Sequence, residues 1–394
     1  MPSVIPIHPD AQVVPLSRFN LHDLESTRLM LRGSSCVDWV RLNFDDDEVI
    51  ESFLRVNEYD LTQRIDRVRL KRLHQKATTY LETHLKYRVP EVVKQAPDIR
   101  ALFRFASQLK GRRAYRFFAC MTLKVMHIIH HVEARELLSK LPISDVEVSV
   151  LVRAKIERAV RGLLEREFPI VDFLGSQKRP NSVYSKLLAK KGTQAAQILD
   201  KLRFRIVVER LEDLPSLLLA LSRELIPFCY VVPGQTHNSL VDLHRLLLRA
   251  GNVKSYSNSE QFQLNELPVT DLVSDQRNEF SGPNYRILNL VVEVPLRIDQ
   301  FMTQHAELFE QLGPVVFGVV EFQLVDKVTA HKNEAGDNRH ALYKARQRQR
   351  VKKRLEAGRR RGEQQASQLS FVADDGSDIT APLSPSSLRP RTGD

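Results

Sequence analysis

Apolar side chains recur every three or four residues through much of the first half of the chain. Representative sets are Ile50, Phe53 and Leu54; Leu102, Phe105 and Leu109; and Phe117, Met121, Val125 and Ile129. Proline and glycine lie between these stretches and are scarce inside them. This spacing places apolar side chains along one face of a helix. The pattern predicts an irregular segment over residues 1–45 and an α-helical domain over residues 46–166.

The hydrophobic period changes after Phe168. Five short runs rich in β-branched residues follow: FPIVDFL (168–174), RFRIVVE (203–209), IPFCYVV (226–232), YRILNLVVEV (285–294) and VVFGVVEFQL (315–324). Helical patterns separate them, at residues 182–191, 214–225 and 300–312. Short apolar runs bounded by turn residues are typical of buried strands. The sequence therefore predicts an α+β fold, in which the N-terminal helical domain precedes a mixed sheet of about five strands flanked by helices.

The composition of the second half divides it further. Residues 167–344 form the predicted α/β domain, and an insertion rich in Asn, Ser, Gln and Asp interrupts it at about 239–282. A basic helix is predicted over 345–362. The last residues, 363–394, are rich in Ser, Pro and Asp, and we expect them to be disordered.

The net charge of +11 is concentrated in one window. Residues 339–361 contain eleven Lys or Arg and a single acid, Glu356, so this window accounts for ten of the eleven net charges. Such a segment can bind RNA phosphates, although a solvated helix face explains it equally well. Any nucleic-acid contact is therefore expected locally, through residues 339–361.

Several classes of protein are excluded or disfavoured by what the sequence lacks. The content of 42% hydrophobic and 27% charged residues excludes a wholly disordered chain. No apolar run is long enough to cross a bilayer and the start has no signal-peptide pattern, so we expect a cytoplasmic protein without membrane contact. The three cysteines form no CxxC pair, which favours buried thiols. The motifs GxxxxGK[ST], GxGxxG, GxSxG and HExxH are absent.

Two polar residues interrupt the last apolar run. Because side chains alternate along a strand, Glu321 and Gln323 share a face with Val319 and the apolar residues before it. A carboxylate in such a place needs a cation, a metal or a cleft. An ion pair with Arg203 or Arg205 and a Mg²⁺ site are two explanations of comparable weight.

The Mg²⁺ explanation requires a second carboxylate. Asp200 precedes the run at 203–209, and together with Glu321 it would supply the oxygen ligands that hold Mg²⁺ against a polyphosphate. Upstream, cations surround the start of a predicted helix, where free N–H groups also favour phosphate. These cations are Lys178, Arg179, Lys186, Lys190 and Lys191. Taken singly, Asp200 and this basic run are more often solvated.

The order of these elements resembles the synthetase domain of RelA/SpoT-type alarmone synthetases, which make (p)ppGpp. The matching segments are RPxxxYS at 179–185, DxxxxR at 200–205, ExQ at 321–323, and ExGxxxHxxYK at 334–344. The resemblance extends from about residue 175 to 344. It implies a nucleotidyltransferase-like sheet and a Mg²⁺-dependent pyrophosphokinase, which transfers pyrophosphate from ATP to the 3′-hydroxyl of GDP or GTP.

The resemblance also implies roles for individual residues. Asp200 and Glu321 would bind Mg²⁺, and with Gln323 they make up the implied catalytic set. Tyr285 would stack on guanine. The other implied nucleotide-binding residues are Arg179, Ser185, Lys186, Lys190, Arg205, His340 and Lys344.

Some positions depart from the family pattern. Asn181, Asn289 and the pair His237–Asn238 stand where the family has other, mostly cationic or charged, residues. Because charge neutralisation drives pyrophosphoryl transfer, these changes keep two alternatives open. One is a catalytically inactive nucleotide- or RNA-binding protein, and the other is an enzyme with tRNA as acceptor.

The family's longer members also carry a metal-dependent hydrolase domain, for which this sequence has no equivalent ligand set. The histidines at 127, 130 and 131 have no carboxylate in register, so we interpret them as structural or surface residues. No oligomeric state follows from the sequence.

Overall fold

The structure is a computed structural model of the chain. It describes residues 14–34, 37, 44, 46–108, 112–177, 180–189, 202–249, 272, 284–334 and 345–356. Most of the expected insertion and the whole tail at 363–394 lie outside these ranges. Within them, no helix is long and apolar enough to cross a membrane.

The segment expected to be irregular contains a helix, α1 (Leu21–Arg32). Its start is fixed by a capping box, in which Asn20 and Asp23 bond each other's backbone N–H groups. It ends at Gly33 in the left-handed conformation, with φ 61°. The expectation of an irregular segment over 1–45 is therefore wrong for residues 21–32.

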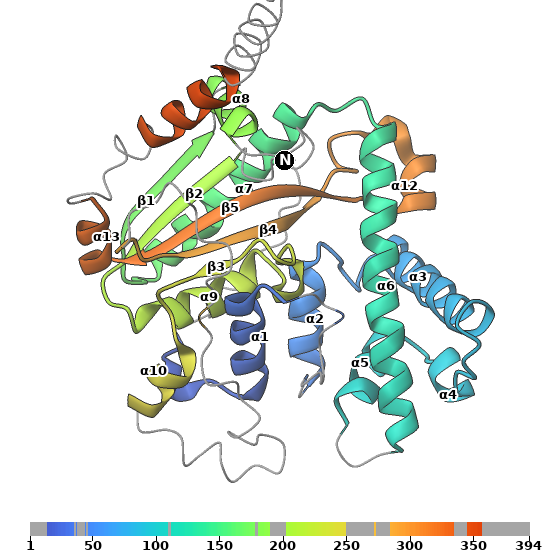
Figure 1. Ribbon diagram of the computed structural model, residues 1–394. Coiled ribbons are helices and arrows are strands. Elements are labelled where there is room, and N and C mark those ends of the chain that lie inside the picture. The colour runs from blue at the N-terminus through green and yellow to red at the C-terminus, as the bar shows by residue number, and fades with distance from the viewer. Residues whose placement is uncertain are drawn as a thin grey trace, which may run out of the picture.

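The first half is helical, as the apolar period predicts. Its helices are α2 (Asp47–Val56), α3 (Arg64–Thr83), α4 (Glu91–Lys94), α5 (Ile99–Ser107), α6 (Arg113–Lys140) and α7 (Asp145–Glu165). Asp46 and Asp98 cap the starts of α2 and α5 by accepting backbone N–H bonds. Helices α2 to α5 and the first half of α6 enclose one apolar core (Figure 1).

Five strands form one mixed sheet in the order β1-β2-β5-β4-β3. They are β1 (Ile170–Gln177), β2 (Leu202–Val208), β3 (His237–Asn238), β4 (Leu288–Arg297) and β5 (Val315–Asp326). β2 and β5 are parallel, and the other neighbouring pairs are antiparallel. The predicted α+β fold with a five-stranded sheet flanked by helices is confirmed.

One predicted strand is wrong. Residues 226–232 contain the 3-10 helix η4 (Phe228–Tyr230), and only Val231 bridges to β4. Pro227 lies within the run and Pro233 directly follows it, and proline has no N–H to donate to a sheet. The fifth strand is the short β3 instead.

The remaining described elements are η1 (Leu16–Arg18), α8 (Pro180–Ala189), α9 (Asp213–Glu224), α10 (Leu243–Arg249), η6 (Thr303–His305), α12 (Ala306–Leu312), α13 (Lys327–Glu334) and a helix at 345–356. The helix expected at 300–312 thus starts as a 3-10 turn, and that at 182–191 is α8. The helix at 345–356 lies beside α8, since Arg354 donates to the Leu188 carbonyl (Figure 1).

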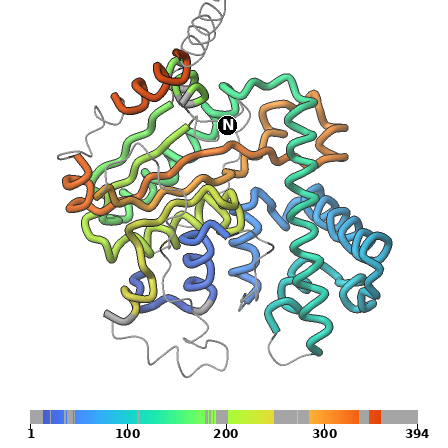
Figure 2. The backbone as a smooth tube through the Cα atoms, in the orientation of Figure 1, coloured from blue at the N-terminus to red at the C-terminus, as the bar shows by residue number. Residues whose placement is uncertain are grey.

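One face of the sheet is packed closely against α7. The Cα of Gly318 approaches α7 so closely that a Cβ there would lie 2.4 Å from Val152. Phe204 stacks near Phe322 on this face and is fully buried. The tube in Figure 2 shows α7 running along the sheet. Residues of α7 and of the strands belong to a single apolar core, so the packing has no division at residue 166.

Among the residues that the structure describes, the opposite face is covered only at its two ends. At one end Phe317 of β5 packs against α6, and at the other Val325 packs against Ala330 of α13. Between these contacts Val319 and Gln323 keep partial exposure. The described elements thus leave a partly accessible stretch of sheet in the middle of β5, within which Glu321 itself is buried.

Candidate functional site

Polar side chains from four strands lie in adjacent rows on the accessible stretch of the sheet. The backbone register sets Arg205 and Asn289 on either side of Gln323, with His237 beyond Asn289. The next row sets Arg203 opposite Glu321. We call this set the polar face; its members are Arg203, Arg205, His237, Asn289, Glu321 and Gln323. Their common orientation follows from the period of two along each strand.

Glu321 is the central acid of the polar face, and both of its carboxylate oxygens have partners. Arg203 donates to Oε2 from Nε and Nη2, at 2.9 and 2.8 Å. Gln323 donates to Oε1 at 3.1 Å. The side chain of Glu321 is 8% exposed and that of Arg203 is 29% exposed. Of the two explanations offered by the sequence, this conformation supports the ion pair, and Arg203 is the partner.

Arg205 has a different environment. It pairs with Glu334 of α13 at 3.0 Å, but the Glu334 side chain is 67% exposed. Exposed pairs of this kind contribute little and exchange readily for another anion. A phosphate arriving at the polar face can therefore compete for the Arg205 guanidinium.

Asn289 carries an unsatisfied acceptor. Its Oδ1 is buried and has no hydrogen-bond partner among the described residues. A buried acceptor without a donor is unfavourable, and in this conformation the oxygen has almost no surface that a bound molecule could reach.

The α6 end of the polar face is closed by a histidine cluster. The imidazole of His131 lies parallel to the Phe317 ring at 4.3 Å and its Nδ1 is 2.8 Å from Glu293 of β4. Burial lowers the pKa of His127 and His130 well below the usual histidine range, so both are neutral. No group of three or more metal-ligating side chains occurs in the part of the chain that the structure describes. These contacts give the three histidines a packing role.

Two further predicted residues have describable positions. The hydroxyl of Ser185 in α8 donates to the Asn181 carbonyl at 2.8 Å, so it is used within its own helix. Tyr285 is half-buried just before β4. Its neighbour Arg286 is held by two backbone bonds to the Asn333 side chain of α13. α13 therefore fixes the approach to the polar face on this side.

The other predicted site residues cannot be placed. Asp200, Arg179, Lys190, His340 and Lys344 lie outside the described residues, as does the side chain of Lys186. The meeting of Asp200 with Glu321 stays a prediction.

The carboxylate that can be described does not fit Mg²⁺ as it stands. A bound Mg²⁺ usually takes one or two carboxylates plus phosphate oxygens. In Glu321 the guanidinium of Arg203 occupies Oε2, and the amide of Gln323 occupies Oε1.

The loop at 233–240 is supported by contacts that no sequence motif predicts. Gly33, at the end of α1, faces Thr236 so closely that a Cβ would lie 2.4 Å from its Oγ1. The side chain of Asn238 donates to the Val241 carbonyl and accepts from the Leu240 and Val241 N–H groups. The only local signal for this support is the glycine after a helical run, which becomes informative once α1 is recognised.

Comparison with known proteins gives structural matches alone. No family model matches the chain, and no curated protein matches it. It is similar in structure to small alarmone synthetase 1 from Bacillus subtilis bound to its product pppGpp, at 17% identity and a TM-score of 0.29, over 57% of this chain and 93% of that one.

Two further structural matches are of the same kind. Small alarmone synthetase 2 from Bacillus subtilis matches at 13% identity and a TM-score of 0.28, over 61% and 97% of the two chains. A GTP pyrophosphokinase family protein from Streptococcus pneumoniae matches at 13% identity and a TM-score of 0.25, and the match covers 58% of this chain and 94% of that one. Similarity at this level assigns no role to any residue.

Proposed function

We propose that the polar face is the active site of a pyrophosphokinase-like transferase. The reaction joins the 3′-oxygen of GDP or GTP to the β-phosphorus of ATP. The bond from that phosphorus to the oxygen bridging to the α-phosphate breaks, the hydroxyl loses its proton, and AMP leaves. The observation that carries the proposal is the accessible middle of the sheet, where two arginines, an acid and two amides lie in adjacent rows between α6 and α13.

Two members of the polar face suit this chemistry. Arg205 can exchange its exposed partner Glu334 for a phosphate, because a bidentate guanidinium–phosphate contact is stronger than an exposed ion pair. The amide of Asn289 can meet the edge of a purine base once its side chain turns, because its Oδ1 is buried in the present conformation. Tyr285, half-buried beside β4, offers a ring for the base to stack on.

A second candidate function is favoured by the state of Glu321. Its oxygens are occupied by Arg203 and Gln323, which is the arrangement expected of a structural carboxylate. In this alternative the protein binds nucleotide or RNA on the same fold without transferring pyrophosphate. The helix at 345–356, which carries six Lys or Arg and one acid, would contact RNA phosphates. Transfer to tRNA would combine both features.

Incubation with labelled ATP tests the proposal. Purified protein is mixed with ATP and GDP, GTP or tRNA, with and without Mg²⁺, and the products are separated by thin-layer chromatography. The proposal predicts a tetra- or pentaphosphate, or a labelled tRNA, together with AMP. Glu321→Gln and Asp200→Asn should abolish the product, whereas Glu307→Gln, on the exposed surface of α12, should leave it unchanged.

A lack of product with all three acceptors would contradict the enzyme. The second candidate is then supported if nucleotide binding persists in Glu321→Gln, and if deletion of residues 345–394 removes RNA binding alone.

A further inference from the structure

The helical half of the chain carries a second concentration of positive charge. Residues 64–124 contain sixteen Lys or Arg and four acids, which gives this range a net charge of +12. The rest of the chain, apart from residues 339–361, is acidic, so this range becomes visible only when charge is counted locally. In Figure 1 its helices, α3 to α5 and the first part of α6, lie on the opposite side of the molecule from the basic helix at 345–356. The two basic regions are therefore separate surfaces.

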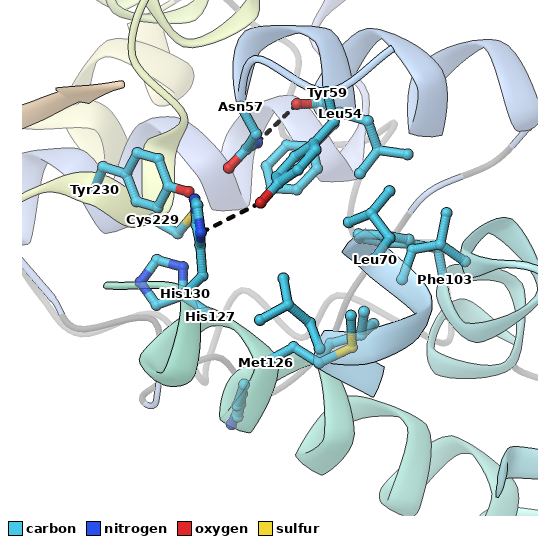
Figure 3. Close-up of a pocket in the computed structure, with 15 residues that line it drawn as sticks. Leu54, Asn57, Tyr59, Leu70, Phe103, Met126, His127, His130, Cys229 and Tyr230 are labelled. Atoms are coloured by element: carbon cyan, nitrogen blue, oxygen red, sulfur yellow. Dashed lines mark hydrogen bonds between the residues drawn. The ribbon is translucent and has the colours of Figure 1, made fainter. Parts of the chain in front are cut away.

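The positive charge lies on the outside of these helices. With α2 and η4, helices α3, α5 and α6 enclose a cavity of about 80 Å³, whose lining is mostly apolar (Figure 3). Its described lining contains one charged side chain, Lys124, and that ammonium donates to the Val37 carbonyl at 2.6 Å. An anion inside the cavity would lose its hydration and meet almost no cation. An anionic partner is therefore expected on the outer surface.

At one end of this region several cations have no acidic partner. Residues 110–132 contain no acid, and the two acids of residues 80–95, Glu82 and Glu91, both pair with Lys94. Like charges held close together repel one another, and a polyanion that binds across them removes this repulsion. The cations that form no ion pair with any acid in the part of the chain that the structure describes are here Lys86, Arg88, Arg112, Arg113 and Arg116.

The backbone holds some of these cations where other residues would be more stable. Arg113 and Arg116 lie in the first turn of α6, which has no acidic residue and no side-chain cap. Cations at this end of a helix oppose the helix dipole. Lys86 has φ 59°, the left-handed conformation that favours glycine, and the Tyr87 N–H donates across it to the Leu81 carbonyl. Such placements are expected where a residue contributes to binding more than to stability.

Exposed aromatic rings lie among these cations. Tyr87 and Phe117 are 40% and 52% exposed, and their ring centroids are 6.5 Å apart. Because Arg113, Arg116 and Phe117 are spaced by three and four residues, they share one face of α6. Rings between cations suit unpaired bases, which stack on the rings while their phosphates contact the charges. We call this set the basic–aromatic surface; its members are Lys86, Tyr87, Arg88, Arg112, Arg113, Arg116 and Phe117.

A single strand suits this surface better than a duplex. The bases of a duplex stack on one another and offer no face to a protein ring, whereas the bases of RNA loops and ends do. We propose that the basic–aromatic surface binds single-stranded RNA, with bases stacked on Tyr87 and Phe117 and phosphates held by the surrounding cations. This binding is independent of pyrophosphoryl transfer and of the helix at 345–356.

Fluorescence anisotropy of a labelled RNA strand of about 12 nucleotides tests the proposal, with the whole chain and without ATP. Phe117→Leu keeps an apolar side chain but removes the stacking face, so it should weaken binding about tenfold. The affinity for a duplex of the same sequence should not change. Phe301→Leu is the matched control, because Phe301 is 53% exposed and lies outside the surface, and it should bind RNA normally. Tyr87→Leu replaces Phe117→Leu if thermal melting shows that the latter fails to fold.

The salt dependence of binding tests the cations. Arg113→Gln combined with Arg116→Gln should reduce the slope of log affinity against log salt concentration by about 1.4, since each contact to a single strand contributes about 0.7. Arg158→Gln combined with Arg161→Gln, at exposed positions on α7, should leave the slope unchanged.

Four results would each overturn the proposal. The first is that the RNA does not bind, and the second is that both leucine variants bind it as tightly as the unaltered protein. The third is that Phe117→Leu weakens binding to phosphatidylserine vesicles or to the duplex but not to the single strand. The fourth is that deletion of residues 345–394 removes all RNA binding from a protein that still melts cooperatively, which would assign the RNA to the helix at 345–356 instead.

Discussion

Replacing Arg203 by Met should destabilise the protein by leaving Glu321 charged and poorly partnered. The carboxylate would lose two bonds of 2.8 and 2.9 Å and keep only the amide of Gln323. Breaking a buried ion pair by removing one partner costs about 3–5 kcal/mol. Because the Arg203 side chain is 29% exposed, water can reach the carboxylate in the variant. We therefore expect Arg203→Met to lower the free energy of unfolding by about 2–3 kcal/mol.

A double-mutant cycle separates the pair from the individual side chains. Glu321→Gln removes the charge that needs Arg203, so adding it to Arg203→Met should restore much of the loss, with a coupling free energy of about 2 kcal/mol. Urea unfolding followed by far-UV circular dichroism measures all four proteins. The matched control is Arg104–Asp47, whose side chains are 46% and 43% exposed; its coupling should stay below about 0.5 kcal/mol. A coupling at Arg203–Glu321 no larger than this control would refute the reasoning.

Three further predictions concern stability elsewhere in the chain. Gly33→Ala should lower the free energy of unfolding in urea by about 1–3 kcal/mol, because φ is 61° and the new Cβ would clash with Thr236. Gly162→Ala is the control on α7, where nothing lies within 4 Å of the new Cβ, and it should raise this free energy by about 0.5–1 kcal/mol. The unfolding free energy should fall as the pH drops from 6.5 towards 4, because the unfolded chain binds protons at three histidines that the fold keeps neutral. Near pH 5 this free energy should change by up to about 4 kcal/mol per pH unit. These are His22, whose pKa burial lowers to about 4, together with His127 and His130. A flat profile between pH 7 and 5 would contradict this. Arg297→Met should lower the free energy of unfolding by about 3–5 kcal/mol in thermal and urea unfolding, because the fully buried Asp66 loses its ion-pair partner. A loss as small as that of Arg104→Met, at an exposed pair, would be evidence against this.

The sequence is sufficient to predict which way Glu321 points but not which arginine it meets. The period of two along a strand places Glu321 and Gln323 on one face whatever the neighbouring strands do. The partner depends on the register between β2 and β5, where a shift of two residues would place Arg205 opposite Glu321. Register is set by the packing of the whole sheet, which no local pattern encodes.

The two errors in the predicted elements have different physical causes. Residues 226–232 have the composition of a buried strand. Residues 228–230 instead form η4, between Pro227 and Pro233, and their side chains are buried there. Tertiary packing there overrides strand propensity. In α1 the missed signals were its ends, the capping box at Asn20 and the glycine at 33, which are specific only when considered together.

The positions that depart from the alarmone synthetase pattern are not equivalent in the fold. Asn238 is buried and its side chain closes a turn through three backbone bonds, so its identity is explained by local structure. The side-chain oxygen of Asn289 stabilises no such turn, because it accepts no hydrogen bond from a described residue. Asn289 lies in the row of Gln323 and Arg205. That row combines two amides with one guanidinium, so on the proposed function most of the phosphate charge of ATP would have to meet cations outside this row. On the proposed function, the amide at position 289 would help to select the acceptor once its side chain turns, because an amide oxygen distinguishes N–H groups from lone pairs.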